Sequence, residues 1–384
     1  MLDSPGEILL SKSALRNNLR FFRRQFGKDV LLSSVVKGNA YGHGIEVYGP
    51  LALECGFEHF SVFSADEAYR LYQVIGKAAP IMVMGYLDDA AMEWAIQEGI
   101  EFWIFDLHRL KKALSLSKQL GQKAKLHLEI ESGMHRTGLE RKEWKPAAKL
   151  LTEQKEHCIL KGICTHFAGA ESISNYVRIK EQKRVFREAL AWFRRQKLEP
   201  EYRHACCSAA AIRYPEMCYD MIRLGILQYG FWPSREIFIE FLKNRTDKRS
   251  PIKRLISWRS TVMSLKEVDA GEFIGYGTSY FTGVKTKLAL VPIGYSGGFS
   301  RSLSNHGRVL INGKRAAVVG TVNMNCLCVD ISEIPNVKPG DEVIIIGKQG
   351  KLELTVSAFT EMSQQLNYEA LTRIPEVMKR SVVE

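Results

Sequence analysis

A lysine lies where a short apolar segment meets a glycine-rich turn. Residues 31–36 are short and largely apolar, as is typical of a buried strand, and Lys37 follows them directly. Gly38, Gly42 and Gly44 then allow the chain to turn and to approach a ligand closely. Because a buried ammonium is costly, such a lysine either extends to water or has a lowered pKa, and the lowered form suits Schiff-base chemistry.

Other polar side chains also follow apolar segments. Arg136 lies between Gly133 and Gly138, and a guanidinium held in this way is a fork suited to carboxylates and phosphates. His166 and Arg223 stand at the ends of two further apolar segments. A surface ion pair for Arg136 and a packed core position for His166 are the alternative interpretations. One polar residue of catalytic type per segment end is nevertheless more than core packing requires.

The segments that position these residues alternate between strands and helices. Eight apolar segments are predicted as strands, at residues 31–37, 59–64, 81–86, 101–106, 125–131, 161–166, 202–207 and 221–225. Helical patterns separate them, as in the long stretch 175–197. This alternation predicts an α/β fold with a closed (β/α)8 TIM-like barrel, in which reacting groups lie at the C-terminal ends of the strands. An open doubly wound sheet is the alternative.

The pattern changes after about residue 245. A polar, proline-bearing stretch at residues 249–254 predicts a linker, so we expect a barrel domain at 1–245 and a second domain at 250–384. Asn312-Gly313 between two apolar runs is a strong hairpin signal, because both residues tolerate the positive φ angles of a tight turn. The second domain is therefore predicted to be a mainly antiparallel β structure.

Composition narrows the possible partners. The net charge of +12 is spread over predicted helices, and the basic run at 243–249 is interpreted as an exposed linker, so we expect no nucleic-acid partner. No apolar run approaches the roughly 18 residues of a membrane span, and the first residues lack a signal-peptide pattern. The eight cysteines have no zinc spacing, which predicts reduced thiols, no metal and a cytoplasmic location.

Residues 37–44, Lys-Gly-Asn-Ala-Tyr-Gly-His-Gly, resemble the pyridoxal-phosphate (PLP) attachment motif of the alanine racemase family. Further segments resemble family motifs in the same order over nearly the whole chain: residues 133–138, 165–168, 204–210, 223–226, 275–280, 291–298, 320–325 and 371–375. A barrel followed by a β domain is also the architecture of that family. The resemblance therefore implies PLP as cofactor and a homodimer with shared active sites.

Individual roles follow from the same resemblance. Lys37 would attach the cofactor, and its phosphate, ring and phenolic oxygen would be bound by residues at the barrel strand ends. The complete set of implied cofactor-binding residues is Lys37, Tyr41, Arg136, His166, Ser208, Arg223, Gly225 and Ile226. Arg136, the backbone of Met324 and Tyr295 at the entrance would bind the substrate. Glu129 stands where many members have a carbamylated lysine, and we interpret it as a carboxylate that holds Arg136 in place.

Racemisation needs one base on each face of the substrate Cα. Lys37 would serve one face, and the resemblance implies that Tyr276 serves the other from the partner subunit. The resemblance also implies that Arg223 lies at the ring nitrogen of the cofactor. Its positive charge would disfavour protonation of that nitrogen, which suits proton exchange better than decarboxylation or transamination. The sequence therefore predicts a PLP-dependent racemase that acts on a small amino acid, alanine.

Three alternatives remain at this point. Asn323, Asn325 and Thr372 depart from the family motifs near the substrate, so a broader specificity or serine racemisation is one alternative. A PLP-dependent decarboxylase of basic amino acids would require a carboxylate at the ring nitrogen, where this chain has Arg223. A non-enzymatic PLP carrier would resemble the barrel alone.

Overall fold

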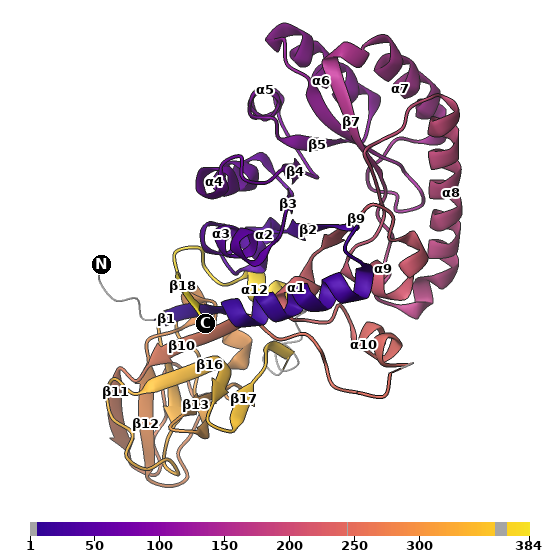
Figure 1. The fold of residues 1–384 in the computed structure, drawn as a ribbon. Helices are drawn as coiled ribbons and strands as arrows, with labels where there is room; N and C mark the ends of the chain where they lie inside the picture. The colour runs from indigo at the N-terminus through magenta and orange to yellow at the C-terminus, as the bar shows by residue number, and fades with distance from the viewer. Residues whose placement is uncertain (1–5, 244, 358–366) are drawn as a thin grey trace. The chain divides into compact units, whose positions relative to one another are not determined.

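The computed structural model describes residues 6–243, 245–357 and 367–384 (Figure 1). The chain divides into two compact units. One consists of Ser13–Lys37 and Gly49–Arg254, and the other of Met1–Lys12, Gly38–Tyr48 and Leu255–Glu384. We call them the barrel unit and the β unit.

The barrel unit is built on eight parallel strands: β2 (Leu31–Val35), β3 (His59–Val62), β4 (Ile81–Val83), β5 (Glu101–Ile104), β6 (Ala124–Glu129), β7 (Cys158–Cys164), β8 (Tyr202–His204) and β9 (Met221–Leu224). They pair in the order β8-β7-β6-β5-β4-β3-β2-β9. An isolated parallel bridge between Cys207 and Arg223 joins the two ends, with the Arg223 amide 3.0 Å from the Cys206 carbonyl oxygen. The predicted barrel is confirmed, and the open-sheet alternative is wrong.

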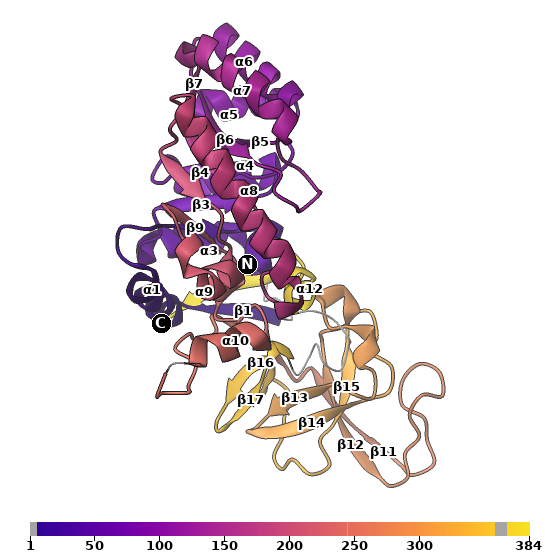
Figure 2. The same ribbon diagram turned by 90° about the vertical axis from the view of Figure 1, so that its right-hand side faces the viewer.

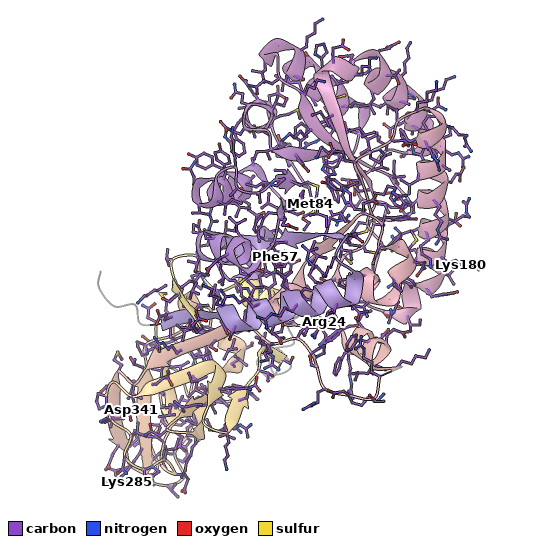
Figure 3. All side chains as sticks on the ribbon, in the orientation of Figure 1. Arg24, Phe57, Met84, Lys180, Lys285 and Asp341 are labelled. Atoms are coloured by element: carbon purple, nitrogen blue, oxygen red, sulfur yellow. The ribbon has the colours of Figure 1, made fainter. Side chains whose placement is uncertain are left out.

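Short, fully buried strands explain the barrel. Every described residue of β3, β4, β5 and β9 is buried, as expected when helices cover one face and barrel side chains fill the other. Figure 3 shows Phe57 and Met84 among these elements, and Lys180 on the outer face of helix α8 (Tyr176–Arg195). Because all the strand pairs are parallel, the carboxyl ends of the strands gather at one end of the barrel.

Further helices connect the strands: α1 (Lys12–Phe26), α3 (Ile45–Cys55), α4 (Ala65–Ile75), α5 (Asp89–Glu98), α6 (Leu107–Leu120), α7 (Arg141–Glu153), α9 (Ser208–Arg213) and α10 (Arg235–Leu242). Their ends follow local chemistry. Asp88 and Asp106 cap α5 and α6 by accepting backbone N–H bonds, and left-handed Gly99 and Gly121 end them. Helix α8, which lies in front of the strands in Figure 2, matches the helix predicted at 175–197.

The β unit contains one sheet in the order β11-β12-β15-β14-β13-β16-β10-β1-β18, with β17 paired to β16. Its strands are β1 (Gly6–Ser11), β10 (Ile256–Thr261), β11 (Ser264–Val268), β12 (Thr286–Val291), β13 (Arg308–Ile311), β14 (Lys314–Val319), β15 (Leu327–Asp330), β16 (Glu342–Gln349), β17 (Leu352–Leu354) and β18 (Lys379–Val383). All described pairs are antiparallel except β1 with β18. The mainly antiparallel prediction is confirmed.

The predicted hairpin is present in this sheet. Strands β13 and β14 pair antiparallel around Asn312 and Gly313, whose φ angles are 48° and 73°. Two successive positive φ angles match the twist of the flanking strands, which is why Asn-Gly is favoured in such turns.

Strand β1 lies within the residue range expected for the barrel, but it belongs to the β unit. It pairs with β10 and β18, and its buried positions alternate with half-buried ones. Ile8 and Leu10 are fully buried on one face. That alternation is typical of a strand with one buried face, whereas β3, β4, β5 and β9 of the barrel are buried on both faces.

Replacing Ile8 by alanine should therefore weaken the β unit. We expect the free energy of unfolding to fall by about 2–5 kcal/mol, because the lost side chain leaves a cavity in a packed face. Leu9→Ala, on the half-buried face of the same strand, is the control and should cost less. Chemical denaturation of both variants checks this, and an equal loss would contradict the assigned faces.

Candidate active site

Lys37 directly follows the end of strand β2. The Val36 amide donates to the Ser61 carbonyl oxygen at 2.8 Å, so the pairing with β3 continues to the residue before the lysine. The Val35 carbonyl oxygen accepts bonds of 2.9 Å from Gln228 Nε2 and from the Tyr229 hydroxyl. The backbone that carries Lys37 is thus held on both sides.

The surroundings of Lys37 favour its neutral amine. Desolvation lowers the pKa of Lys37, and the positive charges of Arg136 and Arg223 lower it further. Cys207 and Glu67 oppose the shift without cancelling it. Lys37 is still exposed to solvent, so its amine is both accessible and less strongly protonated than an ordinary lysine.

The turn after Lys37 is left-handed. The short element α2 (Lys37–Tyr41) has φ angles of 61° at Gly38, 54° at Asn39, 53° at Ala40 and 52° at Tyr41. Three of these residues carry a Cβ, and each such residue costs about 1–2 kcal/mol in this conformation. The Asn39 side chain offsets part of the cost by accepting the Ile45 amide at 3.0 Å.

The C-terminal segment holds this turn within the β unit. Arg380 donates to the Gly42 carbonyl oxygen through Nε at 3.2 Å and through a terminal nitrogen at 2.9 Å. A Cβ on Gly42 would lie 1.9 Å from the Leu371 carbonyl oxygen, so only glycine allows this approach. The ring of Tyr41 lies 5.9 Å from that of Tyr368, which belongs to helix α12 (Asn367–Thr372).

Arg136 lies on the loop after β6, and two glycines and a hydrogen bond define the conformation of this loop. Gly133 and Gly138 have φ angles of 132° and 119°, and the Glu131 carboxylate accepts the His135 amide at 2.8 Å. The Arg136 side chain is exposed and forms no ion pair with any described residue. Its positive charge nevertheless acts on Lys37 and on other groups at this end of the barrel.

Glu129 is buried below that loop. Burial raises its pKa, while a hydrogen bond from Thr137 and the positive charge of Arg136 oppose the shift. Its Oε2 atom has no hydrogen-bond partner among the described residues. Because the described structure contains no ion pair between Glu129 and Arg136, the expected role of Glu129 in holding that arginine stays a prediction.

His166, Ser208 and Arg223 gather at the same end of the barrel unit. Burial, followed by the charges of Arg223 and Arg136, lowers the pKa of His166 to about 3, so its ring is neutral at physiological pH. Ser208 Oγ accepts the Gly225 amide at 2.9 Å, which joins the loops after β8 and β9. Ile226 opens a 3₁₀ helix (Ile226–Tyr229), so its amide has no intrahelical acceptor.

Arg223 is buried and held by several acceptors. Its terminal nitrogens donate to His204 Nδ1, to the His204 carbonyl oxygen at 3.1 Å and to the Thr165 carbonyl oxygen at 2.8 Å. The Ala205 carbonyl oxygen is a further acceptor at 3.4 Å. Among the described residues, Nε has no acceptor, so this N–H remains for a ligand.

The β unit brings Tyr276, Tyr295 and Met324 onto connected loops. The Tyr295 amide donates to the Asn323 carbonyl oxygen, and the Ser296 amide donates to the Met324 carbonyl oxygen, both at 3.0 Å. Thr321 Oγ1 donates to the Tyr276 carbonyl oxygen at 3.2 Å. The Tyr276 side chain is 74% exposed and that of Met324 is 55% exposed, so both can meet a ligand or another chain.

Thr372, the last residue of α12, lies beside the left-handed turn. Its Cγ2 atom is 3.2 Å from the place where a Cβ on Gly38 would lie. The side chain is exposed, and its hydroxyl donates to the Tyr368 carbonyl oxygen at 2.9 Å. A residue at position 372 thus lies next to the backbone that follows Lys37.

Comparison with known proteins identifies the family. The model of the alanine racemase N-terminal domain matches residues 10–233, and that of the C-terminal domain matches residues 255–382. The chain belongs to the alanine racemase family. It is 35% identical to alanine racemase of Leptospira interrogans serovar copenhageni over 378 residues, covering 98% of this chain and 95% of that one.

Solved structures of family members agree with the fold. Alanine racemase of Clostridium difficile 630 superposes with a TM-score of 0.90 at 29% identity, covering 100% of this chain and 97% of that one. Alanine racemase of Bartonella henselae, solved with covalently bound pyridoxal phosphate, gives a TM-score of 0.83 at 25% identity, with 99% and 100% covered. The family predicted from the motifs is thus confirmed.

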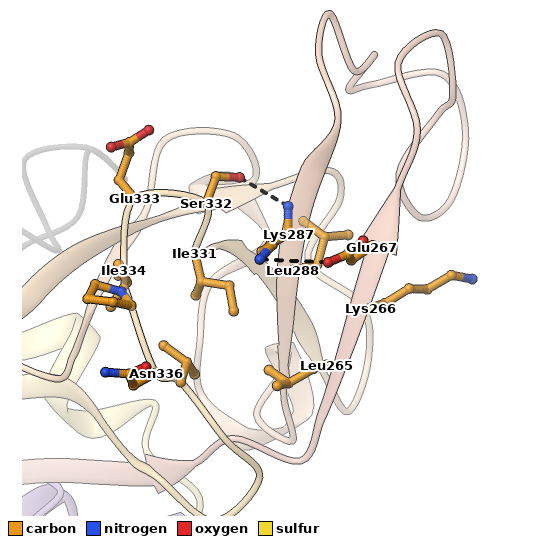
Figure 4. Close-up of a pocket in the computed structure, with 12 residues that line it drawn as sticks. Leu265, Lys266, Glu267, Lys287, Leu288, Ile331, Ser332, Glu333, Ile334 and Asn336 are labelled. Atoms are coloured by element: carbon orange, nitrogen blue, oxygen red, sulfur yellow. Dashed lines mark hydrogen bonds and ion pairs between the residues drawn. The ribbon is translucent and has the colours of Figure 1, made fainter.

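A pocket in the β unit is lined by none of the residues predicted for the site. It has a volume of about 560 Å³ and is lined by segments 265–267, 287–288 and 331–337 (Figure 4). Lys287 pairs with Glu267 at 3.7 Å, and its amide donates to Ser332 Oγ at 3.0 Å. Since its lining includes none of the predicted site residues, this pocket does not alter the assignment of the site.

Two negative findings concern the described residues only. No three His, Cys, Asp or Glu side chains among them are grouped so that they could bind a metal ion. Over the same part of the chain, no helix has the length and apolar character needed to cross a membrane.

The contact at Gly42 can be tested against a glycine of similar conformation. Gly42→Ala should lower the free energy of unfolding by about 1–2 kcal/mol for the left-handed backbone and by roughly 1–3 kcal/mol more for the clash with Leu371. Gly121 is left-handed with a φ angle of 64°, and a methyl group added there would meet no atom within 4 Å, so Gly121→Ala should show the backbone cost alone. Equal losses in denaturation experiments would contradict the close approach.

Proposed function

We propose that this chain is a PLP-dependent racemase that interconverts L- and D-alanine. Its match to alanine racemases over nearly the full length of both chains supports this. The single observation that carries the proposal is the position of Lys37, an accessible amine of lowered pKa at a barrel strand end, beside Arg136 and Arg223.

The residues at this end of the barrel fit the cofactor. Lys37 offers the amine for covalent attachment, and the Ser208 hydroxyl and the Ile226 amide offer donors for a phosphate. Nε of Arg223 is the donor that remains for a ring nitrogen, and the neutral ring of His166 can pack against the cofactor ring. When bound, PLP withdraws electrons and makes the Cα proton of an amino acid acidic.

Three further groups complete the proposed cofactor site. Tyr41 would donate its hydroxyl to the phosphate, and Arg136 would contact the phenolic oxygen. The Gly225 amide donates to Ser208 Oγ in this structure. It could donate to the phosphate only if the Ser208 hydroxyl also moved toward the phosphate. The Bartonella henselae structure with covalently bound pyridoxal phosphate supports the same cofactor.

Arg223 distinguishes racemisation from the related reactions. A guanidinium donates hydrogen bonds but does not accept a proton, and its charge disfavours a protonated ring nitrogen. A decarboxylase would benefit from a carboxylate at this position. A non-enzymatic carrier would not need the β unit with its exposed Tyr276, so both alternatives are less well supported.

Two bases on opposite faces account for racemisation. Lys37 would move the proton of the D-enantiomer, and Tyr276 of the partner subunit would move that of the L-enantiomer. The high exposure of Tyr276 supports a role toward another chain, and we therefore propose a homodimer with shared active sites. The cysteines of the described residues form no disulfide, which suits a reducing compartment, so we place the enzyme in the cytoplasm.

The substrate would be held by Arg136, by the Met324 backbone and by Tyr295 at the entrance. Asn325 Oδ1 accepts from Ser296 Oγ at 2.7 Å, which shows that this neutral residue shapes the same loops. Thr372 lies beside the turn after Lys37, and its side chain is smaller than the tyrosine that the family motif carries at this position. We therefore extend the proposed substrate range to serine.

Lys37→Ala should remove both the activity and the covalent site. We expect wild type incubated with PLP and L-alanine to lose circular dichroism as the racemate forms, and the variant not to do so. Borohydride should fix the cofactor on Lys37 in peptide maps of wild type. Lys28→Ala, at an exposed lysine, is the control. Labelling at another lysine, or no racemisation by wild type, would overturn the proposal.

Tyr276→Phe should slow Cα proton exchange from L-alanine more than from D-alanine. Exchange of the L-alanine Cα proton with solvent should fall by at least about 10²-fold, the scale of one positioned base, while exchange of the D-alanine proton should fall less. Tyr280→Phe removes a hydroxyl from the same loop and should change neither direction strongly. Equal losses from both enantiomers in isotope exchange would refute this division of roles.

Thr372→Tyr should narrow the substrate range. Wild type should racemise serine measurably, and the variant should shift the ratio of kcat/KM values toward alanine by about 10- to 200-fold, the range of a methylene-scale contact. Parallel assays with both amino acids measure this ratio. A wild type restricted to alanine, or an unchanged ratio, would show that position 372 does not set specificity.

A further inference from the structure

A chain of buried polar side chains crosses the interior of the barrel. Such interiors are usually filled by branched apolar residues. Here Glu101 on β5, His127 on β6, His204 on β8 and Arg223 on β9 are each at most 3% exposed. Stability alone does not require this arrangement, because apolar side chains can replace buried ion pairs at little cost.

The hydrogen bonds run from Arg223 to Glu101 without interruption. An Arg223 terminal nitrogen lies 2.5 Å from His204 Nδ1. His204 Nε2 lies 2.9 Å from His127 Nδ1, and His127 Nε2 lies 2.8 Å from Glu101 Oε2. Each imidazole therefore uses both of its nitrogens within the chain.

Arg223 at one end and Glu101 at the other determine which atom donates in each of these hydrogen bonds. Arginine can only donate, and an ionised carboxylate can only accept. Burial alone would raise the pKa of Glu101, but hydrogen bonds from His127 and His59 outweigh it and hold the pKa far below its usual value. Burial also lowers the pKa of His127 and of His204, so both rings are neutral. Each ring must then carry its proton on Nε2 and accept on Nδ1.

A glycine on a neighbouring strand leaves room for the two imidazole rings. Gly162 on β7 lies beside the bond between the two imidazoles. A Cβ there would be 2.1 Å from His127 Nδ1 and 2.8 Å from His204 Nε2. The φ angle of Gly162 is not in the left-handed region, so the space, and not the backbone conformation, requires glycine.

We infer that Glu101 is a positioning residue that acts through His127 and His204 to fix the orientation of Arg223 toward the cofactor ring. The unprotonated Nδ1 of His204 and the nearby carbonyl oxygens accept hydrogen bonds from the terminal nitrogens of Arg223. The Nε atom of Arg223 is then left to donate to the ring nitrogen of the cofactor. The carboxylate also supplies a negative charge for a buried guanidinium. The inference about the ring rests on the proposed function, whereas the direction of the hydrogen bonds does not.

Two residues that are not part of this series of hydrogen bonds also contact Glu101. His59 Nε2 lies 3.3 Å from Oε2, and Lys161 Nζ lies 3.6 Å from Oε1. Neither group lies between Glu101 and Arg223. Lys161 also pairs with Glu201, and its removal changes the charge near Glu101 without breaking the chain. Lys161→Met is therefore the matched control.

The first measurement needs no variant and no cofactor. Nitrogen-15 NMR of histidine-labelled protein without PLP reports which imidazole nitrogens carry protons. We expect His127 and His204 to be protonated on Nε2 alone at neutral pH. A proton on Nδ1 of His204 would overturn the inference, whether or not the protein is a racemase.

The second measurement uses Glu101→Gln, which keeps the shape but replaces the acceptor by an amide that can also donate. We expect mixed tautomers at His127 and His204, a changed absorption band of bound PLP, and a kcat about 10- to 100-fold lower, the scale of lost outer partners at other sites. Gly162→Ala should give the same spectral change. Lys161→Met should keep wild-type tautomers and absorption.

Unchanged tautomers in Glu101→Gln, or equal effects of Glu101→Gln and Lys161→Met, would contradict a positioning role. If wild type itself fails to racemise alanine, the proposed function is wrong. The tautomers of His127 and His204 would still show whether Glu101 sets the direction of the hydrogen bonds.

Discussion

The lowered proton affinity of one amine is the constraint on which the candidate site depends. Lys37 must be deprotonated often enough to react, yet it must remain accessible to a ligand. The structure meets both needs by placing an exposed lysine at a strand end, where desolvation and the cations Arg136 and Arg223 disfavour its charged form. Those cations are also suited to binding carboxylate and phosphate groups, so the same charges serve two purposes.

The barrel brings Lys37 and the two arginines together. Its parallel strands end at one edge, so Lys37 after β2, Arg136 after β6 and Arg223 on β9 converge although they are far apart in sequence. Concentrating positive charge in this way is unfavourable unless a counter-charge is near. Within the barrel unit, Glu101 supplies one, reached from Arg223 through two imidazole rings.

Much of this arrangement could be predicted from the sequence. The apolar strands, the Asn312-Gly313 hairpin and the ordered motifs pointed to the barrel, the antiparallel sheet and the family, because each depends on local pattern or on contiguous residues. The left-handed turn was only partly predictable. Glycines at 38, 42 and 44 indicated a turn, but nothing local indicated that Ala40 and Tyr41 would share the conformation.

Other features depend on contacts between distant segments, which single-sequence patterns do not report. Strand β1 joins β10 and β18 through pairing with residues more than 240 positions away. Arg380 holds Gly42 across a similar separation. The chain from Glu101 to Arg223 was missed because each member looks like an isolated polar residue in its own strand. The only available signal was that histidines and a glutamate occupy strands that are otherwise apolar.

The pKa of Lys37 tests this account most directly. Nitrogen-15 NMR of the Lys37 Nζ atom in the protein without PLP, followed as a function of pH, gives the value without any assumption about the reaction. The account predicts a titration midpoint below that of the exposed lysines in the same spectrum, and a midpoint that rises when Arg136 is replaced by methionine. A midpoint equal to that of the exposed lysines would contradict it.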